Sequence, residues 1–280
     1  MSISVFCPIK NEAQFIGYSI MSVLPYVDEF VYGDGNSTDG TIEIVEHIKN
    51  KYDKNDKIRL LKGVDCKNFT GDYVNMFNGL IKACMSNYIW FLHPDMVVCN
   101  PELIPFIGRD GGLAYWVNIR SFAGENLQTE IIKGRTDKWK TIMRNSLGIH
   151  YYGFYGAPNE DLYFNEITGN AHNYIRDMDN YPYHVADSRL NIQHYCECKP
   201  LERRQEKMAN ILHWGYGFKN KEDVASMVVI HPRVTLKAER DFLGVFEFKP
   251  REDLLPPVFA NYREEFNEVL QKSGHLTFKL

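Results

Sequence analysis

Apolar runs and amphipathic stretches alternate through the first hundred residues of this 280-residue chain, and this alternation limits the folds available to it. Short apolar runs typical of buried strands lie at residues 3–7, 30–32, 58–61 and 88–93. Apolar residues at approximately helical spacing lie between them, at residues 15–24, 42–48 and 73–85. Strands and helices in this order form parallel sheets with right-handed crossovers. The sequence therefore predicts an α/β fold, with a mostly parallel sheet flanked by helices.

The fourth apolar run is interrupted by a histidine and a carboxylate. Residues 90–92 are expected in the middle of the sheet, because continuous apolar runs suit strands that are covered on both faces. Pro94 cannot donate a hydrogen bond to a neighbouring strand, so the strand is expected to end at His93. His93 and Asp95 would then lie at the C-terminal end of this strand. Open α/β sheets bind their ligands at that end.

A second polar loop, residues 33–41, follows the second strand and contains Asp34 and Asp39. The carboxyl ends of neighbouring parallel strands meet at one edge of a sheet, so these acids can converge with His93 and Asp95 on one crevice. Such a group suits a nucleotide together with a divalent metal ion. For Asp39 the alternative is structural, because an aspartate at this place also caps the helix that follows.

Composition narrows the classes of partner and compartment. A formal net charge of −4 gives no electrostatic reason to expect nucleic acid or an anionic membrane as partner. Six cysteines in so long a chain predict reduced thiols and a cytoplasmic location. No apolar run approaches the roughly 18 residues that a membrane span requires. Residues 1–8 lack a basic start and predict a first strand, not a signal peptide.

The second half of the chain is less regular than the first. Strand patterns lie at residues 113–119 and 190–195, and helices are expected at residues 101–107 and 201–211. An aromatic, glycine-rich loop precedes Asn159, which is expected to cap a helix beginning at Glu160. These patterns predict a catalytic domain and an extension packed on it. The domain covers residues 1–211, with a nucleotide-binding half of 1–99 and an acceptor half of 100–211, and the extension covers 212–280.

Several motifs in the first hundred residues carry a resemblance to a known family. They are Ile3-Ser4-Val5, then Lys10-Asn11-Glu12, then Ser22-Val23-Leu24, then Asp34-Gly35-Asn36-Ser37-Thr38-Asp39-Gly40-Thr41. Their order and spacing resemble the nucleotide-sugar glycosyltransferases of the GT-A fold, in particular the family 2-like enzymes. The resemblance implies that Glu12 and Asp34 contact the donor nucleoside. Gly35 stands where many relatives carry a second acid.

The Asp-x-Asp metal motif of these enzymes falls on His93-Pro94-Asp95, with histidine in the first position. The resemblance implies that Asp95 contacts the donor and the metal ion. His93 is either a second ligand, a diphosphate contact or a structural residue at the strand end. Further along, Gln193-His194-Tyr195, followed by Lys199 and other basic residues, resembles the C-terminal histidine that completes the metal site. A buried structural histidine is the alternative.

The resemblance also points to the acceptor side. The Gly153–Gly156 loop and Asn159-Glu160-Asp161 resemble the acceptor loop and the acidic segment of GT-A enzymes, in which the last aspartate is the general base. Asp161 is thus the expected base, and Tyr152 and Glu160 are candidate acceptor contacts. Alternatively, Glu160 and Asp161 only complement a helix dipole. Several aromatic residues form either a stacking platform or part of the core: Tyr115, Trp116, Trp139, Tyr151, Tyr152, Phe154 and Tyr155.

The resemblance and the residues together predict a metal-dependent glycosyltransferase. It is expected to move a sugar from a nucleoside-diphosphate sugar, with UDP favoured, to an acceptor hydroxyl with inversion. The expected ligands are His93, Asp95 and His194, and their imidazoles favour Mn²⁺ over Mg²⁺. A glycan, a protein or a modified nucleobase remains open as acceptor. Two alternatives are a nucleotidyltransferase, for which residues 8–12 lack the glycine-rich phosphate loop, and a non-catalytic nucleotide- or sugar-binding protein.

Overall fold

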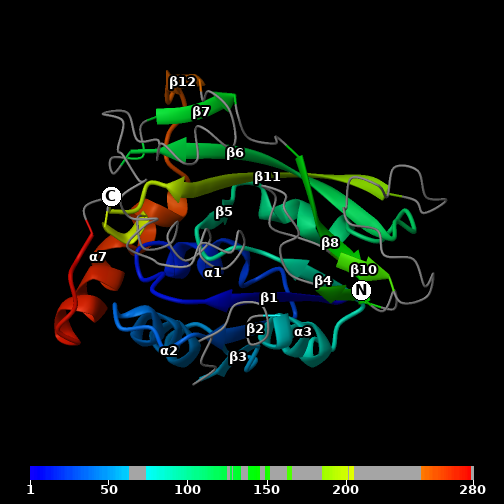
Figure 1. Ribbon diagram of the computed structural model, residues 1–280, viewed down its shortest axis with the longest axis horizontal. Coiled ribbons are helices and arrows are strands. Elements are labelled where there is room, and N and C mark those ends of the chain that lie inside the picture. Colours follow the sequence, from blue (N-terminus) through cyan, green and yellow to red (C-terminus); the bar gives the residue numbers. More distant parts are fainter. Residues whose placement is uncertain are drawn as a thin grey trace, which may run out of the picture.

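The first half of the chain builds the parallel part of a large sheet (Figure 1). The computed structural model describes residues 1–62, 74–124, 127, 129–133, 138–145, 149–151, 163–165, 185–200, 202–204 and 247–278. The first elements are β1 (Ile3–Ile9), α1 (Ile16–Val23), β2 (Glu29–Asp34), α2 (Thr41–Lys51), β3 (Ile58–Leu61), α3 (Val74–Ala83) and β4 (Tyr88–Phe91). Strands β3, β2, β1 and β4 lie side by side in that order and are parallel. The predicted α/β fold is confirmed.

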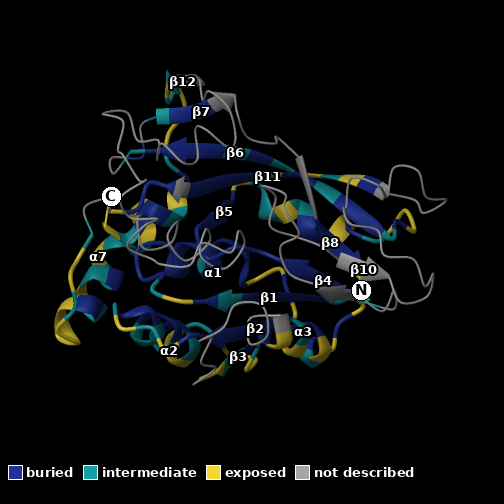
Figure 2. Ribbon diagram, in the orientation of Figure 1, coloured by how far each residue is buried: buried dark blue, intermediate teal, exposed yellow. Residues whose placement is uncertain are grey.

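Helices cover both faces of this parallel part. The chain moves outward from β1 to β3 and then returns to β4 beside β1, so right-handed crossovers place α3 on the face opposite to α1 and α2. Accordingly, α3 packs on β1 and β2, while α1 packs on α2. Every residue of β2 and β4 is buried, which explains their continuous apolar sequences. Figure 2 shows this buried centre, with exposed residues on the outer sides of α2, α3 and α7.

The second half of the chain extends the sheet with antiparallel pairs. Its elements are β5 (Met96–Val98), the 3₁₀-helix η2 (Pro101–Phe106), β6 (Ala114–Ala123), β7 (Thr129–Lys133), β8 (Lys138–Arg144), β9 (Ile149–Tyr151), β10 (Tyr163–Asn165), β11 (Val185–Glu197), β12 (Glu247–Pro250) and α7 (Pro257–Lys272). From β4 the sheet continues through β8, β6, β7 and β12, each antiparallel to its neighbour. Strand β11 pairs with β6 in parallel and with β5 in antiparallel orientation. A strand from late in the chain therefore lies beside the turn after β4.

Two predicted boundaries differ from the structure. Strand β4 ends at Phe91, two residues before the expected end at His93, because the chain turns there into β5. The prediction of a helix beginning at Glu160 is wrong for the residues that the structure describes there. Tyr163–Asn165 forms strand β10, which pairs with β9. Aromatic residues favour such cross-strand pairs over a helix. Of the helix expected at 201–211, residues 202–204 are described and are helical, and the expected domain boundary at 211 lies outside the described residues.

The C-terminal helix α7 packs against the helices of the first half. It contacts both α1 and α2, and its residues Phe259 and Phe266 are buried. The ring of Tyr18 lies 4.4 Å from that of Phe259 and 5.3 Å from that of Phe266, between ring centroids. Gly17 permits this close approach, because a Cβ atom there would lie 2.5 Å from the Phe266 ring. The described end of the chain thus shares a core with its beginning.

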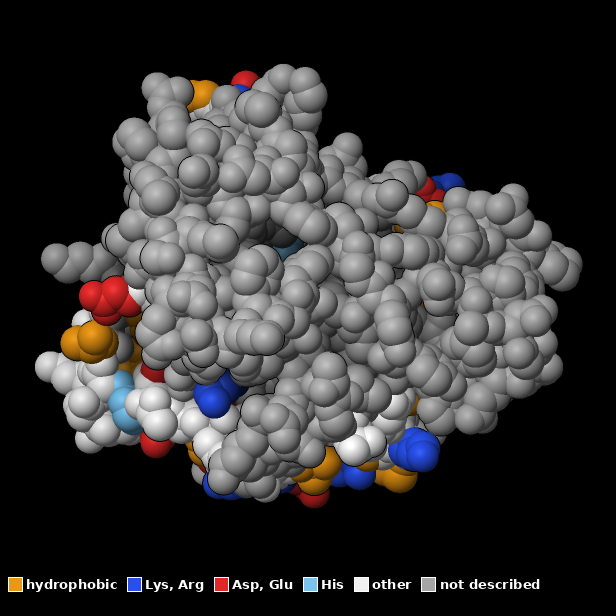
Figure 3. Space-filling view, in the orientation of Figure 1, with side chains coloured by type: hydrophobic (Ala, Val, Ile, Leu, Met, Phe, Trp, Pro, Cys, Tyr) orange, Lys and Arg blue, Asp and Glu red, His pale blue; other side chains and the backbone are white. Residues whose placement is uncertain are grey.

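The described residues show the state of four cysteines, the character of the helices and the distribution of positive charge on one face. The described cysteines Cys7, Cys84, Cys99 and Cys198 are thiols and form no disulfide. Burial, assisted by the charge of Glu29, raises the pKa of Cys84 to about 12, so this thiol stays protonated at neutral pH. No helix in the described part of the chain is long and apolar enough to cross a membrane. In Figure 3, the described Lys and Arg side chains form separate groups along the edge over α2, β3 and α3.

Candidate functional site

The turn between β4 and β5 carries the first two candidate ligands. The backbone oxygen of His93 accepts hydrogen bonds from the Met96 amide at 3.0 Å and from Ser19 Oγ at 3.3 Å, which fix the turn between β4 and α1. The His93 ring lies 4.4 Å from that of Phe91, between centroids. Asp95 is fully buried. A carboxylate can be buried this deeply only where partners compensate for its charge.

Strand β11 brings His194 to Asp95 from about a hundred residues further along the chain. Its pairing with β5 sets His194 opposite Met96, and the Tyr195 amide donates to the Asp95 backbone oxygen at 2.9 Å. His194 Nε2 lies 3.3 Å from Asp95 Oδ1, and the rings of His93 and His194 are 5.7 Å apart between centroids. The structure therefore brings together all three residues that the sequence predicted as metal ligands.

The three side chains have the chemistry and spacing of a metal site. One ligand atom from each of His93, Asp95 and His194 lies within 4.8 Å of the others. Asp95 and His194 are almost completely buried, and His93 is 8% exposed. Two imidazole nitrogens and one carboxylate oxygen suit a divalent transition metal better than Mg²⁺, which prefers oxygen ligands alone. The residues present thus fit a divalent cofactor.

Lys199 is the residue of this site whose role the sequence did not reveal. Its Nζ lies 2.8 Å from Asp95 Oδ2 and also contacts Glu12 Oε2, although Lys199 is only 2% exposed. A buried ammonium is costly unless it is paired, and here it pairs with two carboxylates at once, Glu12 and Asp95. In sequence, Lys199 was one of several basic residues after His194. A lysine just beyond a buried strand is the only local signal that sets it apart.

The loops after β1 and β2 are tied together beside this cluster. The Asn11 amide donates to Ser37 Oγ at 2.9 Å, and Asn11 Oδ1 accepts from the Thr38 amide at 2.8 Å. Asn11 also has a φ of 53°, a left-handed conformation that these contacts hold in place. Asp34 is buried, and its carboxylate accepts from the Ser37 amide at 3.2 and 3.3 Å. Asp34 therefore lies at the carboxyl edge of the sheet, as the sequence predicted.

Asp39 takes the structural role that was its alternative. Its Oδ1 accepts from the Thr41 amide at 3.1 Å, at the start of α2, and its Oδ2 accepts from the Ala13 amide at 3.0 Å. The Thr41 hydroxyl in turn accepts from the Glu12 amide at 2.7 Å. These contacts hold the backbone of Glu12 against the start of α2. The loop thereby fixes the position from which Glu12 reaches Lys199.

The acceptor side of the predicted site lies largely outside the described residues. Tyr152, Glu160 and Asp161 fall there, as does the loop Gly153–Gly156. Tyr115 is described and belongs to the core: it is buried, and its hydroxyl contacts Asp110 and accepts from the Gly108 amide. Tyr115 is therefore not available as part of a stacking platform.

One family model matches more than half of the chain. Residues 4–160 match the family model described as Glycosyl transferase family 2. No curated protein matches the chain.

Solved structures that the comparison matches to this chain share little sequence with it. TarS 1–349 from S. aureus, in complex with UDP-GlcNAc, is 16% identical with a TM-score of 0.45, over 96% of this chain and 82% of that one. Glucosyl-3-phosphoglycerate synthase from Mycobacterium tuberculosis, in complex with phosphoglyceric acid, is 16% identical with a TM-score of 0.41, over 93% and 91%. A longer TarS structure is 16% identical with a TM-score of 0.44, over 96% of this chain, which spans about half (49%) of that chain.

Proposed function

Since the chain belongs to glycosyl transferase family 2, whose model matches residues 4–160, we propose that it moves a sugar from a nucleoside-diphosphate sugar to an acceptor hydroxyl. The donor is a UDP-sugar, a divalent metal ion assists, and the anomeric centre is inverted. The observation that carries this proposal is the buried cluster of His93, Asp95 and His194 at the carboxyl edge of the parallel strands. A donor diphosphate placed there would meet the cation that its departure requires.

In the proposed metal site, His93, Asp95 and His194 each supply one ligand. His93, Asp95 and His194 hold the ion, and their two imidazoles favour Mn²⁺ over Mg²⁺. When bound, the ion neutralises charge on the diphosphate oxygens as the sugar departs. Lys199 holds Asp95 through Oδ2 at 2.8 Å, which keeps Oδ1 on the side of His194. Lys199 thereby orients the carboxylate.

We propose that Glu12 and Asp34 bind the nucleoside of the donor. Asp34 is held by the Ser37 amide and would accept a hydrogen bond from the base or the ribose. Lys199 engages Oε2 of Glu12, so we assign Oε1 of Glu12 to the nucleoside. Glu12 lies in the loop after β1, and Asp34 is the last residue of the neighbouring parallel strand β2. Open α/β sheets bind nucleotides at this edge.

On the acceptor side, we propose that Asp161 takes the proton of the attacking hydroxyl, with Tyr152 and Glu160 contacting the acceptor. A direct displacement of this kind needs no covalent intermediate and inverts the anomeric centre. Asp161→Asn should then lower kcat about a hundredfold or more, whereas Glu160→Gln should mainly raise KM for the acceptor. Equal kcat for Asp161→Asn and the wild type would remove the base assignment. A glycan, a protein and a modified nucleobase are the acceptor classes to be tested.

A panel of nucleotide sugars tests the donor and the metal together. Thermal unfolding of the metal-free protein is followed with UDP-, GDP- and CMP-sugars, each with Mn²⁺, Mg²⁺ or chelator. A donor that binds raises Tm by mass action, and we expect the largest rise for a UDP-sugar with Mn²⁺. Donor hydrolysis or transfer is then measured for the same pair, and we expect both to be lost in chelator.

The variant Asp95→Ala should lose the Mn²⁺-dependent rise in Tm and at least a hundredfold in turnover. Asp28→Ala is its matched control, because Asp28 accepts from the Ile3 amide at 2.8 Å at the opposite end of β1. Asp28→Ala should lower Tm without changing the metal dependence. Unchanged turnover in Asp95→Ala, or full activity of the wild type in chelator, would contradict the metal assignment.

A second candidate function is non-catalytic binding of a nucleotide sugar. The observation that favours it is Lys199, whose ammonium already pairs with both Asp95 and Glu12, so that the fold compensates these charges by itself. A binding protein of this kind would gain Tm with the donor in chelator and release no nucleoside diphosphate under any condition. Turnover with Mn²⁺ excludes it.

The proposal places the protein in the cytoplasm. The thiol state of the described cysteines supports this location, because disulfides are rare in reducing compartments. Cell fractionation with a reporter for each compartment tests it. Recovery with a membrane or extracellular fraction would contradict it.

A further inference from the structure

The strand that carries His194 is held from behind by its two sequence neighbours. Gln193 and Tyr195 flank His194 in β11, and side chains alternate between the two faces of a strand. The Tyr195 hydroxyl contacts Gln193 Oε1, so these two side chains share one face, while His194 points to Asp95 on the other. The Tyr195 ring stacks on Phe15 at 5.3 Å between centroids with an interplanar angle of 9°. Any group that fixes Gln193 and Tyr195 therefore also fixes the direction of His194.

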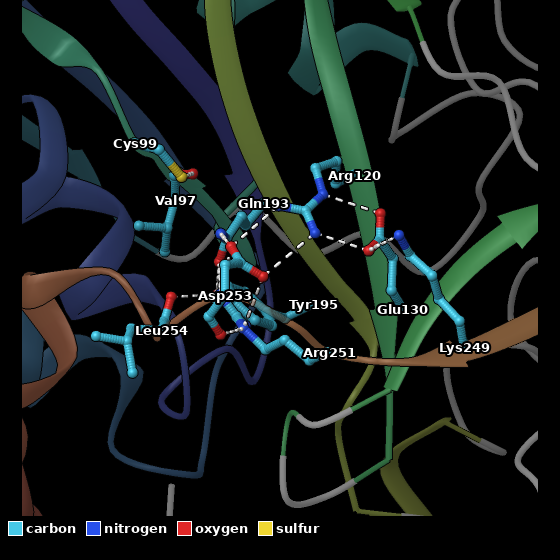
Figure 4. A network of polar contacts seen from close by, with 10 residues as sticks. All are labelled: Val97, Cys99, Arg120, Glu130, Gln193, Tyr195, Lys249, Arg251, Asp253 and Leu254. Carbon is cyan, nitrogen blue, oxygen red and sulfur yellow. Dashed lines mark hydrogen bonds and ion pairs between the residues drawn. The ribbon is translucent and has the colours of Figure 1, made fainter.

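Arg251 and Asp253 hold the amide of Gln193 from both ends. Arg251 Nη2 donates to Gln193 Oε1 at 2.7 Å, and Gln193 Nε2 donates to Asp253 Oδ2 at 3.1 Å. Arg251 Nη1 also reaches the Tyr195 hydroxyl at 3.5 Å. The amide has one orientation that satisfies both partners, because a flip would turn its NH₂ group toward the guanidinium. We call Arg251, Asp253 and Gln193 the Arg251 clamp (Figure 4).

The Arg251 clamp is itself anchored to the sheet. The Arg251 side chain is 4% exposed, and its guanidinium lies over the ring of Phe122 in β6 at 4.4 Å. Arg120 of β6 binds Asp253 at 3.0 and 3.2 Å and Glu130 of β7 at 2.9 and 2.7 Å, so two carboxylates share one guanidinium. Figure 4 shows this row of polar contacts running from Lys249 of β12 through Glu130 and Arg120 to Gln193 of β11. Arg251, Gln193 and Glu130 are the buried members of this network, while Arg120, Asp253 and Lys249 are partly exposed. Hydrogen bonds on both sides of the Gln193 amide favour one arrangement of the buried members.

From this geometry we infer that Arg251 is a positioning residue for His194. It acts through Gln193 and Tyr195, which contact it on one face of β11, while His194 lies on the other face. The role in metal binding rests on the proposed function, whereas the effect on the orientation of His194 does not. The segment after β12 then contributes to the site through the back of β11, where Arg251 and Asp253 hold Gln193. Outer residues that orient a ligand commonly change metal affinity tenfold or more when they are replaced.

The test is a measurement of the His194 imidazole in the metal-free protein. Its ring signals in a ¹H–¹³C or ¹H–¹⁵N spectrum are assigned by their loss in His194→Gln. In Arg251→Met, which keeps apolar bulk over Phe122 but removes the donors, these signals should shift or broaden. Arg59→Met is the matched control, because Arg59 pairs with Glu29 at 2.5 Å in the parallel part of the sheet. It should destabilise the fold while leaving the His194 signals in place.

The same variants are then titrated with Mn²⁺ by electron paramagnetic resonance of the free ion. Arg251→Met should bind Mn²⁺ about tenfold more weakly than the wild type, and Arg59→Met should bind it equally well. Arg251→Lys serves if Arg251→Met does not fold, and it should move the His194 signals in the same way but less.

The two possible failures are distinguishable. Unchanged His194 signals in a folded Arg251 variant overturn the positioning role, whatever the metal does. A wild-type protein that binds no Mn²⁺, or a His194→Gln variant that binds it equally well, overturns the metal assignment of the proposed function. In that case the His194 signals still decide the role of Arg251.

Discussion

The loops after β1 and β2 are tied to each other by contacts between residues that lie close in the sequence. His194, in contrast, lies on strand β11, which is held by Arg251, 58 residues away from Gln193 in the sequence. In the first region, Asn11, Ser37 and Asp39 tie two adjacent loops directly to one another. In the second, side chains on the back of β11 are held by Arg251 and Asp253, which follow β12. The contacts between the two loops lie within residues 1–62, although Arg203 Nε also donates to the Asn11 backbone oxygen at 3.0 Å. The contacts behind β11 need the far end of the chain. Lys199 joins the two, since it pairs with Glu12 of one and Asp95 beside the other.

The largest effect is expected where the two regions are joined. Lys199→Met leaves Glu12 and Asp95 buried without their cation, and removing one partner of a buried ion pair costs about 3 kcal/mol or more. In Mn²⁺, the ion can replace part of the missing charge, so the loss should be smaller than in chelator. Unfolding in denaturant, followed in both conditions, measures the two losses.

Lys57→Met is the matched control for this prediction. Lys57 Nζ donates to the backbone oxygens of Leu24 and Val27 at 3.0 and 2.7 Å, away from the cluster of His93, Asp95 and His194. Its loss of stability should be the same with and without Mn²⁺. If Lys199→Met also loses the same amount in both conditions, Lys199 and the metal ion do not share Asp95.

The two regions also differ in how far the sequence predicts them. Local periodicity was sufficient for β1 to β4 and α1 to α3, because β2 and β4 are buried as a whole and the amphipathic helices alternate with the strands along the chain. It failed at Tyr163–Asn165, where pairing with β9 decides the structure and not local propensity. His93, Asp95 and His194 were predicted from motifs, and the structure brings them together. The role of Lys199 was missed, because its partners lie 187 residues away at Glu12 and in the turn after β4.

A smaller effect is expected where α7 packs on α1. In Gly17→Ala, the new Cβ atom would lie 2.5 Å from the Phe266 ring, which is buried and stacked on Tyr262 at 5.7 Å between centroids. Phe266 cannot move without disturbing its neighbours, so we expect a loss of about 2 kcal/mol in the free energy of unfolding. Chemical denaturation measures it.

Gly79→Ala is the control, because Gly79 lies in α3 and a Cβ atom there meets nothing within 4 Å. Alanine favours a helix over glycine by roughly 1 kcal/mol, so this variant should gain stability. Equal effects of the two substitutions would mean that α7 does not share the core of the first half.

The next effect depends on pH and concerns α7 and α2. Burial would raise the pKa of Glu265, but hydrogen bonds from His47, Tyr52 and Lys51 lower that pKa to about 2. A lowered carboxyl pKa adds stability that is present above the unfolded value near 4.5 and is lost as the pH falls toward 2. Glu265→Gln should therefore cost roughly 1–2 kcal/mol at pH 6, after allowance for solvent screening.

The difference between Glu265→Gln and the wild type should shrink between pH 4.5 and pH 2, which unfolding curves at several pH values measure. Glu268→Gln is the control on the same helix. Glu268 is 65% exposed and pairs with Lys272, one turn further along the helix, so Glu268→Gln should change the stability little at any pH. A constant difference for Glu265→Gln across this range would contradict the role of its charge.

The smallest effect is expected at His93, where a change of ligand alters metal preference without removing a partner of Lys199. His93→Asp exchanges an imidazole for a carboxylate and gives a site with one nitrogen and two oxygen ligands. Mg²⁺ prefers oxygen ligands, so the ratio of Mn²⁺ to Mg²⁺ affinity should fall several-fold. Competition between the two ions for the metal-free protein measures this ratio. His47→Asp is the control, because His47 of α2 contacts Glu265 of α7, away from the cluster of His93, Asp95 and His194. An unchanged ratio in His93→Asp would mean that His93 has a structural role after β4 and does not bind the metal ion. Asp95 and His194 would then be the remaining ligands, and β11 and the Arg251 clamp would have to hold them together.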